Sequence, residues 1–293
     1  MSLFKKLLEA KIRKAGKRYK PRQLRIKWLY PHAQERNYAT LLQRHIRALF
    51  KAYWAGMEGS TLLHEDGYTS LEQLFNDLMA VQNDLFQNGN FAGRILETGK
   101  KVASFNSKEF AKFTGAILGT EYQPREAFTT ALIKEWAEAN QVLVASLTSE
   151  AVSKLNSLTV NAVQQGLTHK ELSKQVKKLE KNLTKARCNL IARDQIGKLN
   201  GNLARQRQQT NAGVEYYQWS TSGDERVRDT HKALDGLVCS WADPTIYSHP
   251  TTPLRWQSRP ATWVQVHPGE DIQCRCVGIP YFAELEQEII DDA

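Results

Sequence analysis

The chain has 293 residues, of which 41% are hydrophobic and 24% are charged, and these proportions are ordinary for a globular protein. The length favours about two domains. No run of about 18 apolar residues occurs, so we expect no membrane-spanning helix. The first residues lack the apolar stretch and cleavage site of a secretory signal. Four cysteines without such a signal predict a reducing compartment.

Positive charge is concentrated at the N-terminus. Residues 1–30 contain eleven lysines and arginines and one acid, a net charge of +10, whereas the whole chain carries +9, so the rest sums to −1. We interpret this segment as a basic arm on a nearly neutral body. Such an arm contacts nucleic-acid phosphates in a salt-sensitive way, pairs with an acidic protein surface, or is simply solvated. Tyr19, Trp28 and Tyr30 are suited either to stacking on bases or to anchoring the arm. The residues predicted to contact nucleic acid are Lys5, Lys6, Lys11, Arg13, Lys14, Lys17, Arg18 and Lys20.

Helical periodicity dominates residues 33–211. Apolar side chains recur there at intervals of three and four residues, which is typical of helices with one buried face. His45 lies within such an apolar stripe and is predicted to be a core histidine rather than a ligand. The predicted helices span about 41–53, 71–86, 93–118, 126–146 and 149–165.

Thr168 and Glu171 have the spacing of a capping box, in which the hydroxyl and the carboxylate each accept a backbone N–H from the other residue. They predict a short helix that ends near Leu179. A long helix is predicted from about Thr184 to Asn211, followed by a glycine that suits its C-terminal end.

The character of the sequence changes after this helix. Residues 220–282 contain six of the nine prolines, three of the four cysteines and three of the seven histidines. Long irregular connections of this kind need a stabilising cross-link, such as a metal ion or a disulfide, or have a function. We expect a small sheet with long loops, followed by an acidic helix over 284–292. The predicted strands are 214–220, 262–266 and 276–279.

A cysteine pair near the C-terminus is the strongest candidate for a site. Cys274 and Cys276 are two residues apart, which on a strand places both sulfurs on one face, and His267 precedes them. Zinc requires four nitrogen or sulfur ligands, and His231 or Cys239 is available to complete the set. The alternatives are reduced thiols packed in a core, or a disulfide, which between positions i and i+2 would be strained. If zinc binds, we expect a structural role.

A second group of charged residues precedes the cysteines. Asp224, Arg226 and Arg228 lie close to His231 in a segment predicted to form a short helix, with Asp224 as its N-cap. We favour a buried ion-pair cluster with a structural role, in which Asp224 or Asp235 pairs with Arg226 or Arg228, over an acid–base site. No paired carboxylates, nucleophile elbow or phosphate loop occurs, so no catalytic residue is predicted.

Several short motifs, in order, resemble the phage Mu F-type head morphogenesis family of minor capsid proteins. The resemblance covers about 150–282 and departs from the family at Asp194-Gln195, where Thr-Glu is expected. The motifs are Ile191-Ala192-Arg193-Asp194-Gln195-Ile196, Asn200, Arg205, Gly213, Tyr217-Gln218-Trp219, Asp224-Glu225-Arg226-Val227-Arg228, His231, Leu234-Asp235-Gly236 and Cys274-Arg275-Cys276.

The resemblance implies a protein of the virion, without enzymatic activity, that lies inside the head near the portal. It would bind the portal, the major capsid protein or the scaffold during assembly in the host cytoplasm, and contact double-stranded DNA. A metal-dependent nuclease or hydrolase that uses His231 and the His267, Cys274 and Cys276 cluster is the alternative.

We therefore predict an α+β protein, with a mainly helical N-terminal half and a small mixed C-terminal domain that contains a short β-sheet and long irregular loops. The predicted parts are a basic arm at 1–30, a helical domain at 31–147, a head-morphogenesis-like domain at 148–282 and an acidic tail at 283–293.

Overall fold

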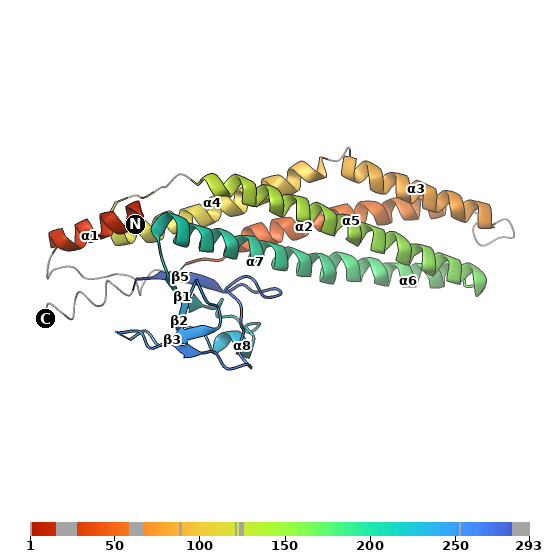
Figure 1. Ribbon diagram of the computed structural model, residues 1–293. Coiled ribbons are helices and arrows are strands. Elements are labelled where there is room, and N and C mark those ends of the chain that lie inside the picture. The colour runs from red at the N-terminus through yellow and green to blue at the C-terminus, as the bar shows by residue number, and fades with distance from the viewer. Residues whose placement is uncertain are drawn as a thin grey trace. The chain divides into compact units, whose positions relative to one another are not determined.

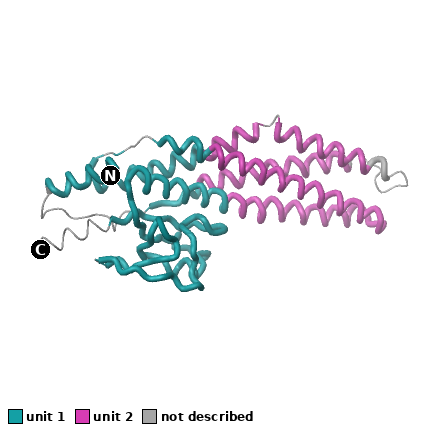
Figure 2. The backbone as a smooth tube through the Cα atoms, in the orientation of Figure 1, with its two compact units in different colours: residues 1–32, 100–133, 193–293 teal, residues 33–99, 134–192 magenta. Residues whose placement is uncertain are grey.

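The computed structural model describes residues 2–15, 28–58, 67–87, 90–120, 122, 126–251 and 253–282. The chain divides into two compact units, each built from separated segments (Figure 2). Unit 1 contains residues 1–32, 100–133 and 193–293, and unit 2 contains residues 33–99 and 134–192. The predicted domains, by contrast, are contiguous. The units are discontinuous because three long helices each contribute a segment to both.

The fold class is the predicted one, with helices in the N-terminal half and a small sheet in the C-terminal part (Figure 1). None of the helices in the described ranges combines the length and apolar character that crossing a membrane requires. The helices are α1 Leu3–Ala15, α2 His32–Glu58, α3 Gly67–Gln87, α4 Phe91–Leu118, α5 Ala127–Gln164, α6 His169–Lys181, α7 Cys188–Gln206 and α8 Asp229–Lys232, with two π-helical turns, η3 Asn182–Arg187 and η4 Arg207–Ala212.

Unit 2 is a helical bundle in which polar side chains connect α2 to α5. Tyr53 and Thr159 share a hydrogen bond of 2.8 Å between their hydroxyl oxygens, and His45 Nε2 lies 3.2 Å from the hydroxyl of Thr148. His45 is buried and packs against the ring of Phe91. Burial lowers the pKa of His45 to about 4, so the imidazole is neutral at pH 7. The prediction of a core histidine is confirmed.

Two predicted helix boundaries are wrong. The helices expected at 126–146 and 149–165 are one continuous helix, α5. The buried hydroxyl of Thr148 donates to the carbonyl of Val144 within the helix, so this threonine does not interrupt it. Similarly, Thr184 donates to Glu180 instead of capping a new helix. Helical structure therefore continues from His169 through η3 and α7 to the end of η4.

The capping box that opens α6 is confirmed. The side chain of Thr168 accepts from the backbone N–H of Glu171, and the carboxylate of Glu171 accepts from the backbone N–H of Thr168. At the other end of this helical run, Gly213 has the left-handed conformation, with φ of 67°, which favours glycine after a helix.

Unit 1 also contains an antiparallel sheet, in which five strands of the described residues follow the order β4-β3-β2-β1-β5. Tyr217 and Trp219 of β1 are both buried, so their face of the sheet packs into the core. The predicted strands 214–220 and 276–279 are confirmed as β1 and β5. The strands are β1 Tyr216–Ser220, β2 Val238–Ser240, β3 Ile246–Ser248, β4 Gln257–Ser258 and β5 Val277–Tyr281.

The predicted strand at 262–266 is wrong. The guanidinium of Arg259 donates to the carbonyl of Val264 at 2.9 Å and to that of Val266 at 3.1 Å. A buried side chain thus occupies the acceptors that a neighbouring strand would use, and the segment remains a loop.

The N-terminal arm contributes to the core of unit 1. Phe4 and Leu8 of α1 are buried, and the Phe4 ring packs on Tyr122 and Phe282. Trp28 is buried against Phe110 and Phe113, so this aromatic side chain anchors the chain rather than presenting a surface for bases. Tyr19, Lys17, Arg18 and Lys20, and the acidic helix expected at 284–292, lie outside the described residues.

A buried arginine connects the helical and loop segments of unit 1. Arg207 is 1% exposed, and its Nε and Nη2 atoms lie 2.6 and 2.5 Å from the two carboxylate oxygens of Glu126. Its Nη1 atom donates to the side-chain oxygen of Asn106. A buried guanidinium held in this way depends on its counter-charge.

We predict that Glu126→Gln lowers the free energy of unfolding by about 3 kcal/mol, because it leaves the Arg207 charge buried and uncompensated. Chemical denaturation measures this loss. The matched control is Glu138→Gln, which removes one partner of an exposed ion pair with Lys134 and should change stability by less than about 0.5 kcal/mol. Equal effects of the two substitutions would contradict the prediction.

Candidate functional site

One histidine and two cysteines converge beside the sheet of unit 1. His231 Nδ1 lies 3.6 Å from the sulfur of Cys274 and 3.5 Å from the sulfur of Cys276. The three potential ligand atoms lie within 4.8 Å of one another, and all three side chains are buried. We call this group the His-Cys-Cys cluster. Its histidine comes from α8, and its cysteines come from the loop that leads into β5.

The loop that carries the cysteines is held against α7. The backbone N–H of Gln273 donates to a carboxylate oxygen of Asp194 at 3.0 Å, and Arg193 Nη1 donates to the side-chain oxygen of Gln273 at 3.0 Å. Gly197 permits the close approach, since a Cβ atom there would lie 2.5 Å from the carbonyl oxygen of Cys274. The helix therefore fixes the position of the backbone that carries the two cysteines.

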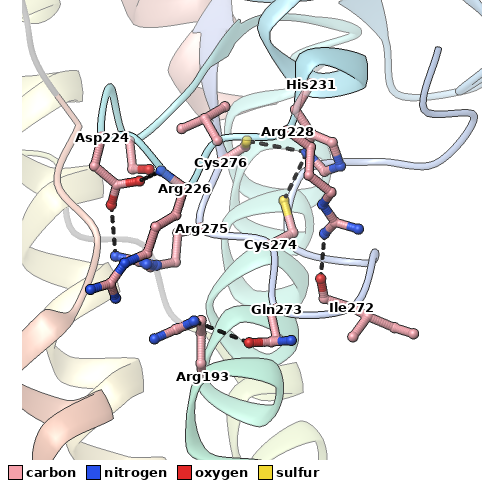
Figure 3. Close-up of a pocket in the computed structure, with 12 residues that line it drawn as sticks. Arg193, Asp224, Arg226, Arg228, His231, Ile272, Gln273, Cys274, Arg275 and Cys276 are labelled. Atoms are coloured by element: carbon pink, nitrogen blue, oxygen red, sulfur yellow. Dashed lines mark hydrogen bonds and ion pairs between the residues drawn. The ribbon is translucent and has the colours of Figure 1, made fainter. Parts of the chain in front are cut away.

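Asp271 orients the imidazole. Its Oδ2 atom lies 2.9 Å from His231 Nε2 and 3.0 Å from Arg228 Nη1. With Nε2 directed at a carboxylate, Nδ1 faces the two sulfurs (Figure 3). The sequence did not identify Asp271. The only available signal was its place in the segment between His267 and Cys274.

The environment of the cluster favours a charged thiol. The hydrogen bond with Cys276, together with those from His231 and the backbone of Gly269, holds the pKa of Cys274 well below its usual range despite burial. Burial lowers the pKa of His231, but hydrogen bonds to Cys274 and Asp271 outweigh it, and the net shift is upward. The hydrogen bond with Cys274, along with burial, raises the pKa of Cys276. Of these three shifts, only that of Cys274 is toward the form that binds zinc, because a metal requires thiolates and an imidazole nitrogen without its proton.

The other two predicted ligands lie elsewhere. His267 Nδ1 lies 3.1 Å from the hydroxyl of Tyr217, and its ring packs on Trp241. Burial lowers the pKa of His267 to about 4, so it is neutral at pH 7. Cys239 is buried in β2, where burial raises the pKa of its thiol next to Arg259. The structure brings together three of the five predicted ligands, and all four cysteines of the chain are free thiols.

The predicted charged cluster exists, but with different pairings. Asp224 accepts from the backbone N–H of Arg226 at 3.0 Å and pairs with Arg275 Nη1 at 2.9 Å. Arg228 pairs with Asp271. The expected pairing of Asp224 or Asp235 with Arg226 or Arg228 is therefore wrong, and the cluster is not buried, because Arg226 and Arg228 are exposed. The predicted N-cap is wrong too, because α8 begins at Asp229 and its N-cap position is Arg228.

These groups line a cavity of about 280 Å³. In Figure 3 the two cysteines lie between Asp224 and Arg275 on one side and His231 and Arg228 on the other. The residues around the cavity are Arg193, Ser222, Asp224, Arg226, Val227, Arg228, His231, Ile272, Gln273, Cys274, Arg275 and Cys276. A polar cavity therefore opens onto three potential metal ligands.

The described basic residues of the arm differ in exposure. Lys5 lies 3.6 Å from a carboxylate oxygen of Glu215, and Lys11 Nζ donates to the carbonyl of Ile117. Lys6, Arg13 and Lys14 are exposed on α1. Among the basic residues of the arm that the structure describes, these last three are the exposed ones.

Residues 153–279 match the family described as "Phage Mu protein F like protein". This segment of the chain is a phage Mu F-like region, and it contains α7, the sheet except for the end of β5, and the His-Cys-Cys cluster. The resemblance found in the sequence is confirmed over these residues.

Two relatives are described only as uncharacterized proteins. One, from Haemophilus influenzae, is 35% identical over 148 residues, which are 50% of this chain and 29% of the relative. The other, from Methanocaldococcus jannaschii, is 30% identical over 118 residues, 40% of this chain and 18% of the relative. The chain thus spans less than a third of the length of either relative. No solved structure matches the chain.

Proposed function

We propose that this chain is a minor head protein of a tailed double-stranded DNA phage. In this role it binds the portal, the major capsid protein or the scaffold during head assembly in the host cytoplasm, and stays in the virion near the portal. The observation that carries the proposal is the family match over residues 153–279. The chain's role is that of an assembly protein rather than an enzyme.

We also propose that the His-Cys-Cys cluster holds a structural zinc ion. His231 Nδ1 and the sulfurs of Cys274 and Cys276 are ligand types that zinc prefers. The contact between His231 Nε2 and Asp271 is the outer hydrogen bond that metal-binding histidines commonly make. Zinc would link α8 to the loop before β5, in a part of the chain where regular structure is short.

A metal-dependent hydrolase is the second candidate, and one observation favours it. The cluster supplies three protein ligands and lines a cavity, whereas a purely structural zinc site has four protein ligands. An open position beside a cavity is what a metal-activated water needs.

The exposed basic residues of α1 support a further part of the proposal, contact with the packaged DNA. Lys6, Arg13 and Lys14 occupy one helix whose apolar residues Phe4 and Leu8 are buried. The helix is therefore held in place while its cations face solvent, as contact with a phosphate backbone requires.

We predict that the chain copurifies with proheads assembled from the portal, capsid and scaffold proteins of its own phage. Quantitative mass spectrometry of heads made with and without portal measures the outcome. Retention only with portal supports portal binding, and equal retention supports a capsid or scaffold contact. Absence from both kinds of head would overturn the proposed function.

We predict one zinc ion per chain in freshly purified protein, measured by elemental analysis. His231→Asn, Cys274→Ser and Cys276→Ser should lose the metal, whereas Cys239→Ser and His267→Asn should keep it because those residues lie outside the cluster. Asp271→Asn should weaken zinc binding by about 10- to 100-fold.

Thermal melting of every variant identifies those that fail to fold. A folded Cys239→Ser protein without zinc would show that the ligand set is wrong, and metal-free wild-type protein would reject the site. Zinc-loaded protein that cleaves DNA or another phosphodiester, with cleavage lost in His231→Asn, would favour the hydrolase.

We predict that replacing Lys6, Arg13 and Lys14 by Gln weakens binding to duplex DNA. If each contacts one phosphate, the slope of log affinity against log salt should fall by about 2 to 3. Fluorescence anisotropy across a salt series measures the slope. The control replaces three exposed lysines of unit 2, Lys51, Lys134 and Lys154, with Gln. Identical slopes for the two triple variants would remove α1 as a DNA contact.

A further inference from the structure

The cavity beside the His-Cys-Cys cluster has an excess of positive charge. Four guanidinium groups line it, from Arg193, Arg226, Arg228 and Arg275, against the single carboxylate of Asp224. Asp271 lies behind Arg228 and pairs with it, and Asp235 accepts from the backbone N–H of Thr221. Asp194 accepts from the lining residue Gln273 but is paired with Lys198, so the positive groups remain in excess when these three acids are counted.

The cluster does not cancel this excess. Its members are one histidine and two cysteines, so it adds no carboxylate to the lining of the cavity.

The arginines flank the cluster on both sides. Arg226 and Arg275 both contact Asp224, through a backbone N–H and a guanidinium respectively. Arg228 lies on the other side, where it donates to the carbonyl of Ile272 (Figure 3). Arg275 and Arg228 use part of their donor set on these contacts. Since each guanidinium has five N–H groups, donors remain for a ligand in the cavity.

Arg226 has the greatest freedom of the four. It is exposed, and its side chain has no ion-pair partner in the part of the chain that the structure describes. The Asp224 carboxylate pairs with the guanidinium of Arg275 and accepts from the backbone N–H of Arg226, so the Arg226 guanidinium is not used in this contact.

The shape and charge of the cavity favour a compact anion with several acceptor oxygens. Arginine forks match phosphate oxygens in a bidentate manner, with stronger hydrogen bonds than neutral pairs make. A volume of about 280 Å³ accommodates a phosphate group with part of its ester, but not a duplex. The terminal phosphate of a nucleotide or nucleic-acid end fits these limits.

We propose that the cavity lined by Arg193, Arg226, Arg228 and Arg275 binds a phosphate monoester beside the His-Cys-Cys cluster. This inference goes beyond the proposed head-assembly role and does not depend on zinc. With zinc in place, the same cavity gives the phosphate access to the fourth coordination position, because all three protein ligands line it.

The test is calorimetric titration of the full chain with inorganic phosphate, a 5′-phosphorylated tetranucleotide and the same tetranucleotide with a 5′-hydroxyl. We expect saturable binding of the phosphate-bearing probes at one site and much weaker binding of the 5′-hydroxyl form. Arg226→Gln should weaken binding about tenfold, the loss expected for one charge-assisted contact.

The matched control is Arg255→Gln, which removes the same charge from an exposed arginine of unit 1 that does not line the cavity. It should leave binding unchanged. Tighter binding of the phosphorylated oligonucleotide than of inorganic phosphate identifies a nucleic-acid end as the ligand, and equal binding identifies free phosphate. Equal binding by the two variants, or no saturable binding of any probe, overturns the inference.

Titrations of zinc-loaded and chelator-treated protein separate this inference from the zinc proposal. Phosphate binding by protein that takes up no zinc would reject the metal and leave the cavity's ligand in place. Zinc uptake without phosphate binding would support the metal site and reject the phosphate ligand. Failure of the chain to enter heads would bear on neither result.

Discussion

The close packing of the loop 267–276 on one face of α7 is the constraint on which the site depends. Two glycines of α7, Gly197 and Gly201, form this contact. A Cβ atom at Gly201 would lie 2.5 Å from the carbonyl oxygen of Pro268, and one at Gly197 would lie as close to Cys274. Gly269 has φ of +89° and lies against the same helix face. Because the backbone of the loop meets the helix directly, a change of side-chain rotamer cannot shift the loop, and the backbone that carries the thiols is held against α7.

Two further contacts transmit this constraint to the sheet. Gln208 of η4 donates to the carbonyl of Gly278 in β5 at 2.7 Å and accepts from the indole of Trp241 at 3.0 Å. The buried Arg207 next to it connects the same helical turn to Glu126. A single helical turn thus joins three parts of unit 1. A domain with short strands and long loops gains rigidity in this way, from specific polar contacts rather than from extended regular structure.

Local sequence patterns identified those features that depend on neighbouring residues. The capping box at Thr168 and Glu171, the alternation along β1 and the apolar stripe around His45 each involve residues a few positions apart. The loop at 262–266 and the convergence on His231 depend instead on contacts between distant residues. Arg259 donates to the carbonyls of Val264 and Val266, within the segment whose side-chain pattern resembles a strand. Asp271 reaches His231 across forty positions.

Contacts between distant residues also decide which of the five candidate ligands lie in the His-Cys-Cys cluster. Cys239 and His267 satisfied the composition of a metal site as well as His231 did. Their positions are decided by burial beside the aromatic rings of β1 and its neighbours, where Tyr217 provides the partner for His267. A hydrogen-bonded neutral histidine in a core and a metal-binding histidine differ only in what faces the second nitrogen. That difference is a property of the fold, and no spacing along the chain encodes it.

The arrangement around His231 also bears on whether the cluster is only a staple. A purely structural site would close its fourth position with a protein ligand and exclude solvent. Here the three donors line a cavity together with four arginines, of which Arg226 and Arg228 are exposed and keep donors for an anion. Stability alone does not account for such a placement. The proposed zinc ion and the proposed phosphate ligand would together account for the buried thiols and for the cationic cavity beside them.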